Sequence, residues 1–191
     1  MTEVALTPLG LILVTIWLML PAYLANTVAS IVGGGPSIDY GRNWRDGNRI
    51  LGDGKTWRGL IGGTLGGLLV GHLQITHTDF FSGDVVVYTL WGSTPYLIFF
   101  LLAFGALTGD IAASFIKRRK GHERGTKSPL LDMYDFIFGA LILTWLFGEG
   151  WLNHWLFSDW VPLITLIIAT PILHRSVNIL GYKLGVKQVP W

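Results

Sequence analysis

The sequence contains no cysteine and few charged residues, and both shortages narrow the class of protein. Without cysteine the chain forms no disulfide, no thiolate metal site and no cysteine nucleophile. Charged residues make up only 14% of the 191 residues, whereas 51% are hydrophobic. Soluble domains are typically about 25% charged. The composition is therefore that of an integral membrane protein.

The first residues also lack the basic region that precedes the apolar core of a signal peptide. Residues 1–8 contain one glutamate and no lysine or arginine. We therefore expect the first apolar stretch to remain in the protein as a membrane span.

Long apolar runs predict an all-α integral membrane protein with five transmembrane helices. A span needs roughly 20 apolar residues in succession, and runs of this kind recur along the chain. We expect one membrane-embedded domain over 1–191, with helices at about 6–32, 58–78, 94–117, 133–151 and 159–179. Two polar segments, 33–57 and 118–132, are the longer loops between them.

The positive charges gather on one side of these predicted spans. All 14 lysines and arginines lie in or beside 33–57, 118–132 and the C-terminal segment. Because cytoplasmic loops are enriched in these residues, we expect a plasma-membrane protein with its N-terminus outside and its C-terminus in the cytoplasm. Four tryptophans flank the opposite helix ends, where interfacial aromatic residues are expected: Trp91, Trp151, Trp155 and Trp160.

Small and polar residues mark the first two predicted helices. Glycines spaced four apart form one ridge on the second helix, at Gly59, Gly63, Gly67 and Gly71. This ridge predicts close packing against another helix, and clearance for a lipid tail is the alternative. Asn26, near the cytoplasmic end of the first helix, is either an interhelical hydrogen-bonding group or a ligand contact.

An aspartate lies inside the apolar part of the third predicted helix. Asp110, Ser114 and Lys117 share one face, at i, i+4 and i+7. Asp110 lies about 10 Å deeper than Lys117, too deep for its short side chain to reach the membrane surface. It must therefore face protein, water or a cation. A structural ion pair with a loop arginine is the alternative to a functional role.

Two further carboxylates open the fourth predicted helix. Asp132 and Asp135 are three residues apart and share one face. An N-cap or a helix-dipole effect would explain Asp132 but not Asp135. Together with Asp110 they gather three carboxylates at one membrane face. Oxygen ligands suit Mg²⁺, and the surrounding basic residues suit phosphate groups.

The segment 33–57 combines many glycines with charges of both signs. Gly33, Gly34 and Gly35 can direct backbone N–H groups at an anion. Aspartates alternate with basic residues over the rest of the segment, at Asp39, Arg42, Arg45, Asp46, Arg49, Asp53, Lys55 and Arg58. The pattern favours a role in binding nucleotide phosphates, with a structured interfacial cap as the alternative.

Five sequence blocks together resemble one family. They are P-A-Y-L-A-N from Pro21, G-G-G-P-S-I-D-Y-G from Gly33, D-G-N-R-I-L-G-D-G-K-T-W-R-G from Asp46, G-D-I-A-A-S-F-I-K-R-R from Gly109 and P-L-L-D-M-Y-D-F from Pro129. Through them the chain resembles the archaeal CDP-archaeol synthases, which are CTP-dependent cytidylyltransferases. It is more distantly similar to phosphatidate cytidylyltransferases, although Met133 and Tyr134 stand where a Gln-Leu pair is usual and the histidine-glycine-glycine element is missing.

The resemblance implies a reaction and a set of site residues. CTP and an isoprenoid diether glycerol phosphate would give a CDP-archaeol-type lipid and pyrophosphate, with Mg²⁺ as cofactor, in archaeal phospholipid biosynthesis. Asp110, Asp132 and Asp135 would hold the metal, and Lys117 would be a further catalytic residue. The implied substrate-binding residues are Asn26, Gly33, Gly34, Gly35, Asp39, Arg45, Asp53, Lys55, Thr56, Arg58, Ser114 and Arg118. No nucleic-acid partner is expected, and a homo-oligomer stays open.

Two other functions compete with this interpretation. A CDP-alcohol phosphotransferase also uses a metal and a lipid, but its aspartate-rich signature is missing after Asp132. A small transporter would place polar groups near the bilayer midplane and often shows repeated halves. Here the polar groups gather at one face and the sequence has no evident repeat.

Overall fold

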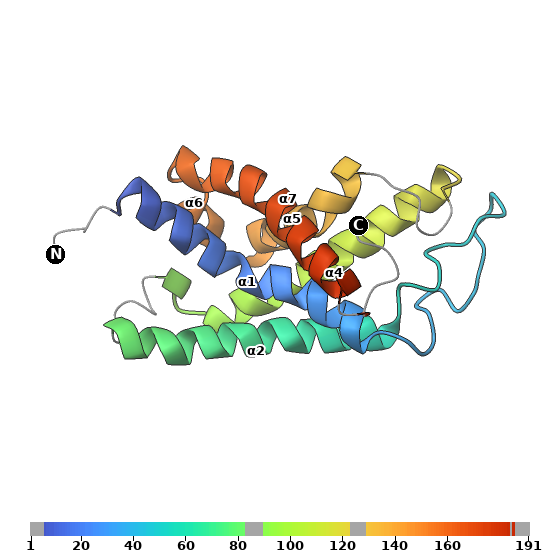
Figure 1. The fold of residues 1–191 in the computed structure, drawn as a ribbon, viewed down its shortest axis with the longest axis horizontal. Helices are drawn as coiled ribbons and strands as arrows, with labels where there is room; N and C mark the ends of the chain where they lie inside the picture. The colour runs from blue at the N-terminus through green and yellow to red at the C-terminus, as the bar shows by residue number, and fades with distance from the viewer. Residues whose placement is uncertain (1–5, 83–89, 123–128, 184, 186–191) are drawn as a thin grey trace.

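Three prolines begin helices, because proline pre-sets the φ angle of the first turn and needs no hydrogen-bond acceptor there. They are the first residues of α1 (Pro8–Val32), α4 (Pro95–Arg119) and α5 (Pro129–Phe147). The remaining helices of the described residues are α2 (Trp57–Ser82), α6 (Trp151–Trp155) and α7 (Trp160–Lys183). The structure is a computed structural model that describes residues 6–82, 90–122, 129–183 and 185. The long helices lie side by side in an elongated bundle (Figure 1).

The predicted all-α class is confirmed over the described residues. Four helical stretches are long and apolar enough to cross a membrane: Pro8–Val32, Trp57–His77, Pro95–Arg119 and Trp160–Lys183. Each overlaps a predicted span. The predicted span at 133–151 corresponds to α5, which is not among the four, so five spans and their orientation stay predictions.

The fourth helix differs from its predicted position of 133–151. It runs from Pro129 to Phe147, four residues earlier at both ends. The early start follows from Pro129, and the early end from the glycines after Phe147, since Gly150 takes a positive φ of 78°. Asp132 consequently lies in the first helical turn and not in a loop, and the remainder of the predicted helix is replaced by the short α6.

The glycine ridge of α2 packs closely against neighbouring helices, as predicted. A Cβ atom at Gly63 would lie 2.7 Å from the carbonyl oxygen of Ala25 in α1, and one at Gly67 would lie 2.8 Å from that of Pro21. A Cβ at Gly71 would collide with the ring of Phe99 in α4. These positions therefore serve helix packing and leave no clearance for a lipid tail.

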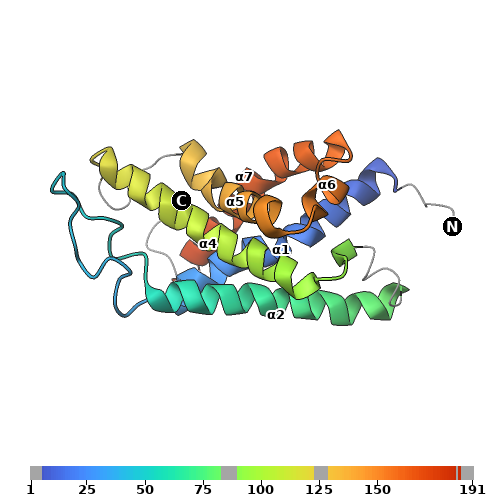
Figure 2. The same ribbon diagram turned by 180° about the vertical axis from the view of Figure 1, so that it is seen from behind.

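Glycines also bring α4 and α5 into backbone contact. A side chain at Gly139 would collide with the backbone of Gly105 and Gly109. One at Gly109 would collide with the carbonyl oxygen of Asp135. The two helices run in opposite directions, so this contact sets Asp110 and Asp135 on adjacent backbone segments (Figures 1 and 2).

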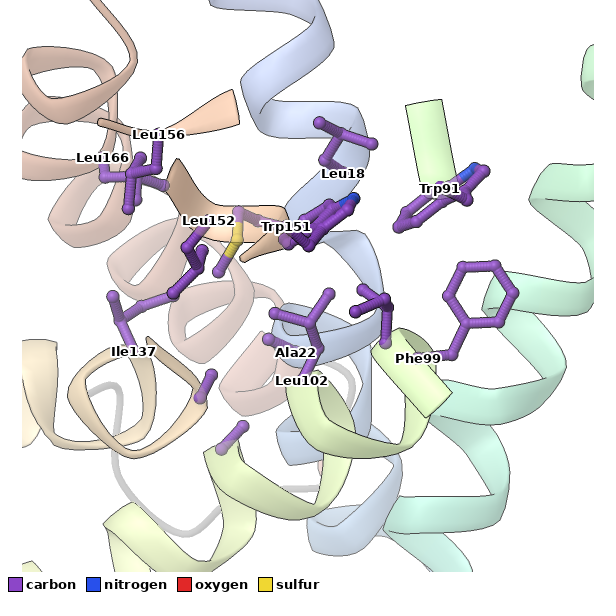
Figure 3. Close-up of a cluster of buried hydrophobic side chains, with 14 of the residues drawn as sticks. Leu18, Ala22, Trp91, Phe99, Leu102, Ile137, Trp151, Leu152, Leu156 and Leu166 are labelled. Atoms are coloured by element: carbon purple, nitrogen blue, oxygen red, sulfur yellow. The ribbon is translucent and has the colours of Figure 1, made fainter. Parts of the chain in front are cut away.

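Aromatic residues form much of the core near the end of the bundle that contains the short α6. The rings of Trp91 and Trp151 stack at 5.8 Å with an interplanar angle of 3° (Figure 3). The indole N–H of Trp151 donates to the carbonyl of Leu90 at 2.8 Å. Trp91 and Trp151 are therefore core residues and not the interfacial anchors that were predicted, whereas Trp160 is 70% exposed.

The charged segments lie together at one end of the molecule. The loop 33–56 extends beyond α1 and α2, beside the C-terminal end of α4 (Figures 1 and 2). The start of α1 and the short α6 lie at the other end (Figure 1). The predicted site residues thus belong to one end of the bundle.

Candidate active site

Two lysine–aspartate ion pairs define this end of the bundle. The Lys55 ammonium lies 2.5 Å from Oδ2 of Asp110, and the Lys117 ammonium lies 2.6 Å from Oδ1 of Asp132. Lys117 thus pairs with α5 across the helix interface. Asp110 receives a lysine from the loop, where the competing interpretation expected an arginine. All four side chains are partly shielded from solvent.

The third predicted carboxylate lies beside these pairs. Asp135 is buried, and one of its carboxylate oxygens accepts the backbone N–H of Phe136 at 2.6 Å. Its carboxylate interacts electrostatically with Asp110, Lys117 and Lys55. The two lysines reduce the mutual repulsion of the three acidic groups that lie together here.

A cavity of about 70 Å³ adjoins the Lys55–Asp110 pair. Asn26 and Ser30 of α1 line it together with Thr56 at the end of the loop. This volume holds a few water molecules and not a nucleotide. The ion pair forms part of the cavity wall, so breaking it would enlarge the space available to a ligand.

Asp39 is the structural centre of the loop 33–56. Its buried carboxylate accepts both Nε (3.2 Å) and Nη2 (2.8 Å) of Arg49, and the backbone N–H groups of Leu51 and Gly52, each at 2.9 Å. Burial tends to raise the pKa of Asp39. The bonds from Arg49, Gly52 and Leu51 outweigh burial and hold that pKa far below its ordinary value. Asp39 therefore orders the loop from inside, as the structured-cap alternative requires.

Other predicted residues of this loop lie at its surface or at its junction with the helices. Asp53 is exposed and pairs with Arg49 at 2.8 Å, and Arg45 is exposed. Thr56 is buried, and its hydroxyl accepts the backbone N–H of Gly59 at 3.1 Å in the first turn of α2. This bond is the kind an N-cap residue makes.

The glycine segment reverses the chain after α1. Gly34 and Gly35 have φ angles of 107° and 73°, which favour glycine. A Cβ atom at Gly33 would lie 2.9 Å from the carbonyl oxygen of Ala29. The exposed Arg58 runs alongside, since a Cβ at Gly35 would lie 3.4 Å from its Cδ. Gly33–Gly35 thus lie near one basic side chain, and their role in binding an anion stays a prediction.

Arg119 ties the loop to α4 and was not predicted as a site residue. Its guanidinium donates to the carboxylate of Asp46 at 2.6 Å and to the carbonyl of Arg49 at 2.5 Å. It also lies 5.0 Å from the centre of the Phe115 ring and 5.9 Å from that of Trp44. The run of basic residues at the end of α4 was the sequence signal that could have indicated this role of Arg119. The same run is also typical of residues that only anchor a helix on the cytoplasmic side of a membrane.

Arg118 contacts the same loop, and Ser114 lies deeper. The Nε of Arg118 donates to the carbonyl of Leu51 at 3.3 Å, and its Nη1 donates to that of His122. Ser114 is buried within α4. The predicted phosphate contact of Arg118 therefore has to compete with these carbonyl groups.

The residues present fit a magnesium ion in chemistry more than in spacing. Among the described residues, no group of three or more histidine, aspartate or glutamate side chains is close enough to hold a metal. Asp110 and Asp132, however, each already bind a cation, the ammonium of a lysine. Carboxylate oxygens are also the ligands that Mg²⁺ takes. The magnesium site stays a prediction.

Comparisons with known proteins agree with the sequence blocks. A family model described as CarS-like, CDP-archaeol synthase, matches residues 8–191. A CDP-archaeol synthase of Methanospirillum hungatei is 50% identical over 174 residues, which are 91% of this chain and 100% of the relative. One from Archaeoglobus fulgidus is 45% identical over 183 residues, 96% of this chain and 99% of that protein.

A solved structure supports the fold as well. It concerns "an intramembrane enzyme for archaeal membrane lipids biosynthesis" and aligns with a TM-score of 0.59 and 33% sequence identity. The alignment covers 90% of this chain and 92% of the other. With a family model over almost its whole length and relatives of this similarity, the chain belongs to the CDP-archaeol synthase family.

Proposed function

We propose that the protein transfers the cytidylyl group of CTP to the phosphate of an isoprenoid diether glycerol phosphate. The products are a CDP-archaeol-type lipid and pyrophosphate. Membership of the CDP-archaeol synthase family supports the reaction. Two lysine–aspartate contacts beside a glycine-rich loop support the location that we propose for the active site. They are Lys55–Asp110 and Lys117–Asp132.

The reaction needs charge neutralisation more than proton transfer. An oxygen of the lipid phosphate attacks the α-phosphorus of CTP and forms the new P–O bond. The bond from that phosphorus to the oxygen bridging the β-phosphate breaks, and pyrophosphate leaves with the electron pair. Because the attacking phosphate is already an anion, no general base is required, and catalysis rests on positioning and on cationic groups.

Lys55 and Lys117 are the basic groups best situated for this task. Their ammonium groups lie 2.5 and 2.6 Å from carboxylates, so phosphate oxygens would compete with Asp110 and Asp132 for them. Arg58 and Arg118 would add further positive charge at the end of the loop. Bound Mg²⁺, held by Asp110, Asp132 and Asp135, would supply charge neutralisation at the phosphates.

The proposal includes an orientation in the membrane. α5 joins the four apolar stretches as a fifth span, with the N-terminus outside and the C-terminus in the cytoplasm. The distribution of lysine and arginine supports this arrangement. The site then faces the cytoplasm at the plasma membrane, where it meets water-soluble CTP on one side and lipid on the other.

Purified protein incubated with CTP, Mg²⁺ and geranylgeranyl diether glycerol phosphate tests the reaction. We expect equal amounts of pyrophosphate and CDP-lipid. Failure to form either product with any lipid phosphate would overturn the proposed function.

A further inference from the structure

Three carboxyl groups and two ammonium groups lie together at the charged end of the bundle. Asp110 holds the ammonium of Lys55 at 2.5 Å. Asp132 holds that of Lys117 at 2.6 Å. Asp135 is 7% exposed, makes no ion pair with any described residue, and accepts only the backbone N–H of the residue that follows it. Two of the three carboxyl groups therefore already have a cation, and the buried third has none.

The two lysines together supply the charge that one divalent metal ion would supply. Each ammonium carries one positive charge, and each lies on an aspartate that is predicted to hold Mg²⁺. The side chains of Lys55 and Lys117 are only 21% and 19% exposed. Repulsion between cations is strong where water is partly excluded. A divalent ion that enters beside both lysines is therefore repelled by them.

The side chain of Lys55 can leave its position while the loop stays in place. The backbone of Lys55 is held separately, since its N–H donates to the carbonyl of Gly52 at 3.2 Å and its carbonyl accepts the N–H of Ile38 at 2.8 Å. The ammonium group also borders the cavity of about 70 Å³, which gives it room to move. A lysine side chain is flexible, and its ammonium is a compact charge that can change partner.

The neighbouring arginines are held differently. The Nε of Arg118 donates to the carbonyl of Leu51, and a guanidinium nitrogen of Arg119 donates to that of Arg49. These bonds tie the backbone of the loop to α4, so the arginines cannot change partner without releasing the loop. The two lysines are consequently the cations of this site that can be exchanged.

We propose that Lys55 and Lys117 hold the place of the metal ion in the unliganded protein, and that a bound triphosphate draws their ammonium groups away from the carboxylates. This inference rests on the proposed function, which supplies the triphosphate as CTP. Phosphate oxygens are strong acceptors for ammonium groups, and the freed carboxylates can then bind a divalent ion. Nucleotide and metal therefore raise each other's affinity. Without nucleotide, the two lysines keep the affinity for a divalent ion low.

Manganese binding in the absence of nucleotide tests this exchange. Mn²⁺ takes the same oxygen ligands as Mg²⁺, and electron paramagnetic resonance measures its free concentration. We expect Lys55→Met to lower the Kd of the purified protein for Mn²⁺ by about tenfold or more, because a repelling charge is removed. Lys117→Met should act in the same direction. Structural damage alone would weaken metal binding, so the direction of the change distinguishes the two explanations.

Lys120→Met is the matched control. It removes the same charge at the same end of the bundle, but Lys120 is exposed and follows α4. Its Kd for Mn²⁺ should stay within about twofold of the wild-type value, because exposed charges are screened. Lys55→Arg keeps a cation at the site and should retain weak binding. Equal Kd values in Lys55→Met, Lys117→Met and Lys120→Met would overturn the inference.

Thermal stability provides a second measurement, because loss of a lysine leaves a partly buried carboxylate without its cation. The Tm of Lys55→Met in detergent should lie below that of the wild type and should rise when MgCl₂ is added without nucleotide. The wild-type Tm should change little, since its lysines already occupy the site. An equal response of the two proteins to MgCl₂ would contradict the exchange.

These measurements require neither turnover nor lipid, so they separate this inference from the proposed function. If the wild type makes no CDP-lipid but both lysine variants bind Mn²⁺ more tightly, the reaction is wrong and the role of the lysines stands. If the wild type makes CDP-lipid and neither variant binds Mn²⁺ more tightly, the reaction stands and the exchange is wrong.

Discussion

The Lys55 ammonium of the loop 33–56 lies 2.5 Å from the Asp110 carboxylate of α4. One residue belongs to a polar loop and the other to an apolar helix, so their contact fixes how deeply the loop reaches into the bundle. It also supplies the cation that a carboxylate at this depth requires. A ligand that binds Lys55 or Asp110 and breaks their contact must either loosen the loop or supply the charge that the displaced residue provided.

We expect Asp110→Asn to lower the rate of CDP-lipid formation by about 100-fold or more, because removal of a charged group from such a site typically costs that much. Asp159→Asn makes the same chemical change at the start of α7, where the side chain accepts the backbone N–H of Val161 at 2.9 Å. An asparagine also accepts that bond, so this control should keep its activity. Full activity in Asp110→Asn would remove Asp110 from the site.

Asp39 should be the residue on which the loop depends most. Asp39→Ala removes one of the carboxylates that bind Arg49 and the acceptor of the backbone N–H groups of Gly41, Leu51 and Gly52. We expect it to destabilise the loop by about 2–4 kcal/mol. Limited proteolysis within 33–56 in detergent measures this effect. The control is Asp53→Ala, which removes an exposed partner of Arg49 and should change cleavage little. Equal cleavage of both variants would contradict the central role of Asp39.

The same carboxylate predicts how the loop responds to acid. The folded-state pKa of Asp39 lies below its unfolded value of about 3.9. Its contribution to stability is therefore complete above that value and is lost as the pH falls toward the folded-state pKa. Below about pH 4, hydrogen-exchange protection of Leu51 and Gly52 should decrease by up to about tenfold per pH unit. In Asp39→Asn, protection should be low and independent of pH in this range.

Gly109→Ala tests the contact between α4 and α5. The added Cβ would collide with the carbonyl oxygen of Asp135 and would lie 2.9 Å from Cα of Gly139. We expect a loss of about 1–3 kcal/mol, as is typical of overpacking, measured as a lower Tm in detergent. Gly10→Ala is the matched control in α1, where the nearest atom would be 3.4 Å away, and its Tm should be unchanged or higher.

The absence of cysteine makes the orientation in the membrane easy to test. Asn153, in α6, and Lys120, after α4, are both exposed and lie at opposite ends of the bundle. In intact cells, a membrane-impermeant maleimide should label Asn153→Cys and not Lys120→Cys. Permeabilised cells should give labelling of both. The reverse pattern in intact cells would invert the proposed orientation.

Some of the molecule follows from local sequence, and some needs the tertiary structure. The apolar runs located four helical stretches, and the spacing of Gly63 and Gly67 correctly predicted close packing, because both signals depend on the period of a single helix. The depth of Asp110 likewise indicated that it faces protein or water, with a cation as its expected partner. Which lysine supplies it could not be predicted, since that depends on where a long loop returns in space.

The same limitation explains the other differences. The charges of the loop 33–56 alternate in sequence, and nothing in that pattern distinguishes the buried Asp39 from the exposed Asp53. Trp91 and Trp151 were expected at the interface because of their positions at helix ends. Their stacking at 5.8 Å depends on packing between segments far apart in the chain.

Gly139 fits between Gly105 and Gly109, which are one turn apart in α4. The backbones of the two helices consequently interlock at this point. A shift of one helix along the other by a fraction of a turn would make their backbone atoms collide. Sliding would have to occur in whole turns, a step of about 5.4 Å. The alignment of Asp110 with Asp135 is thus either in register or lost entirely, and gradual adjustment must come from the loop and from α7.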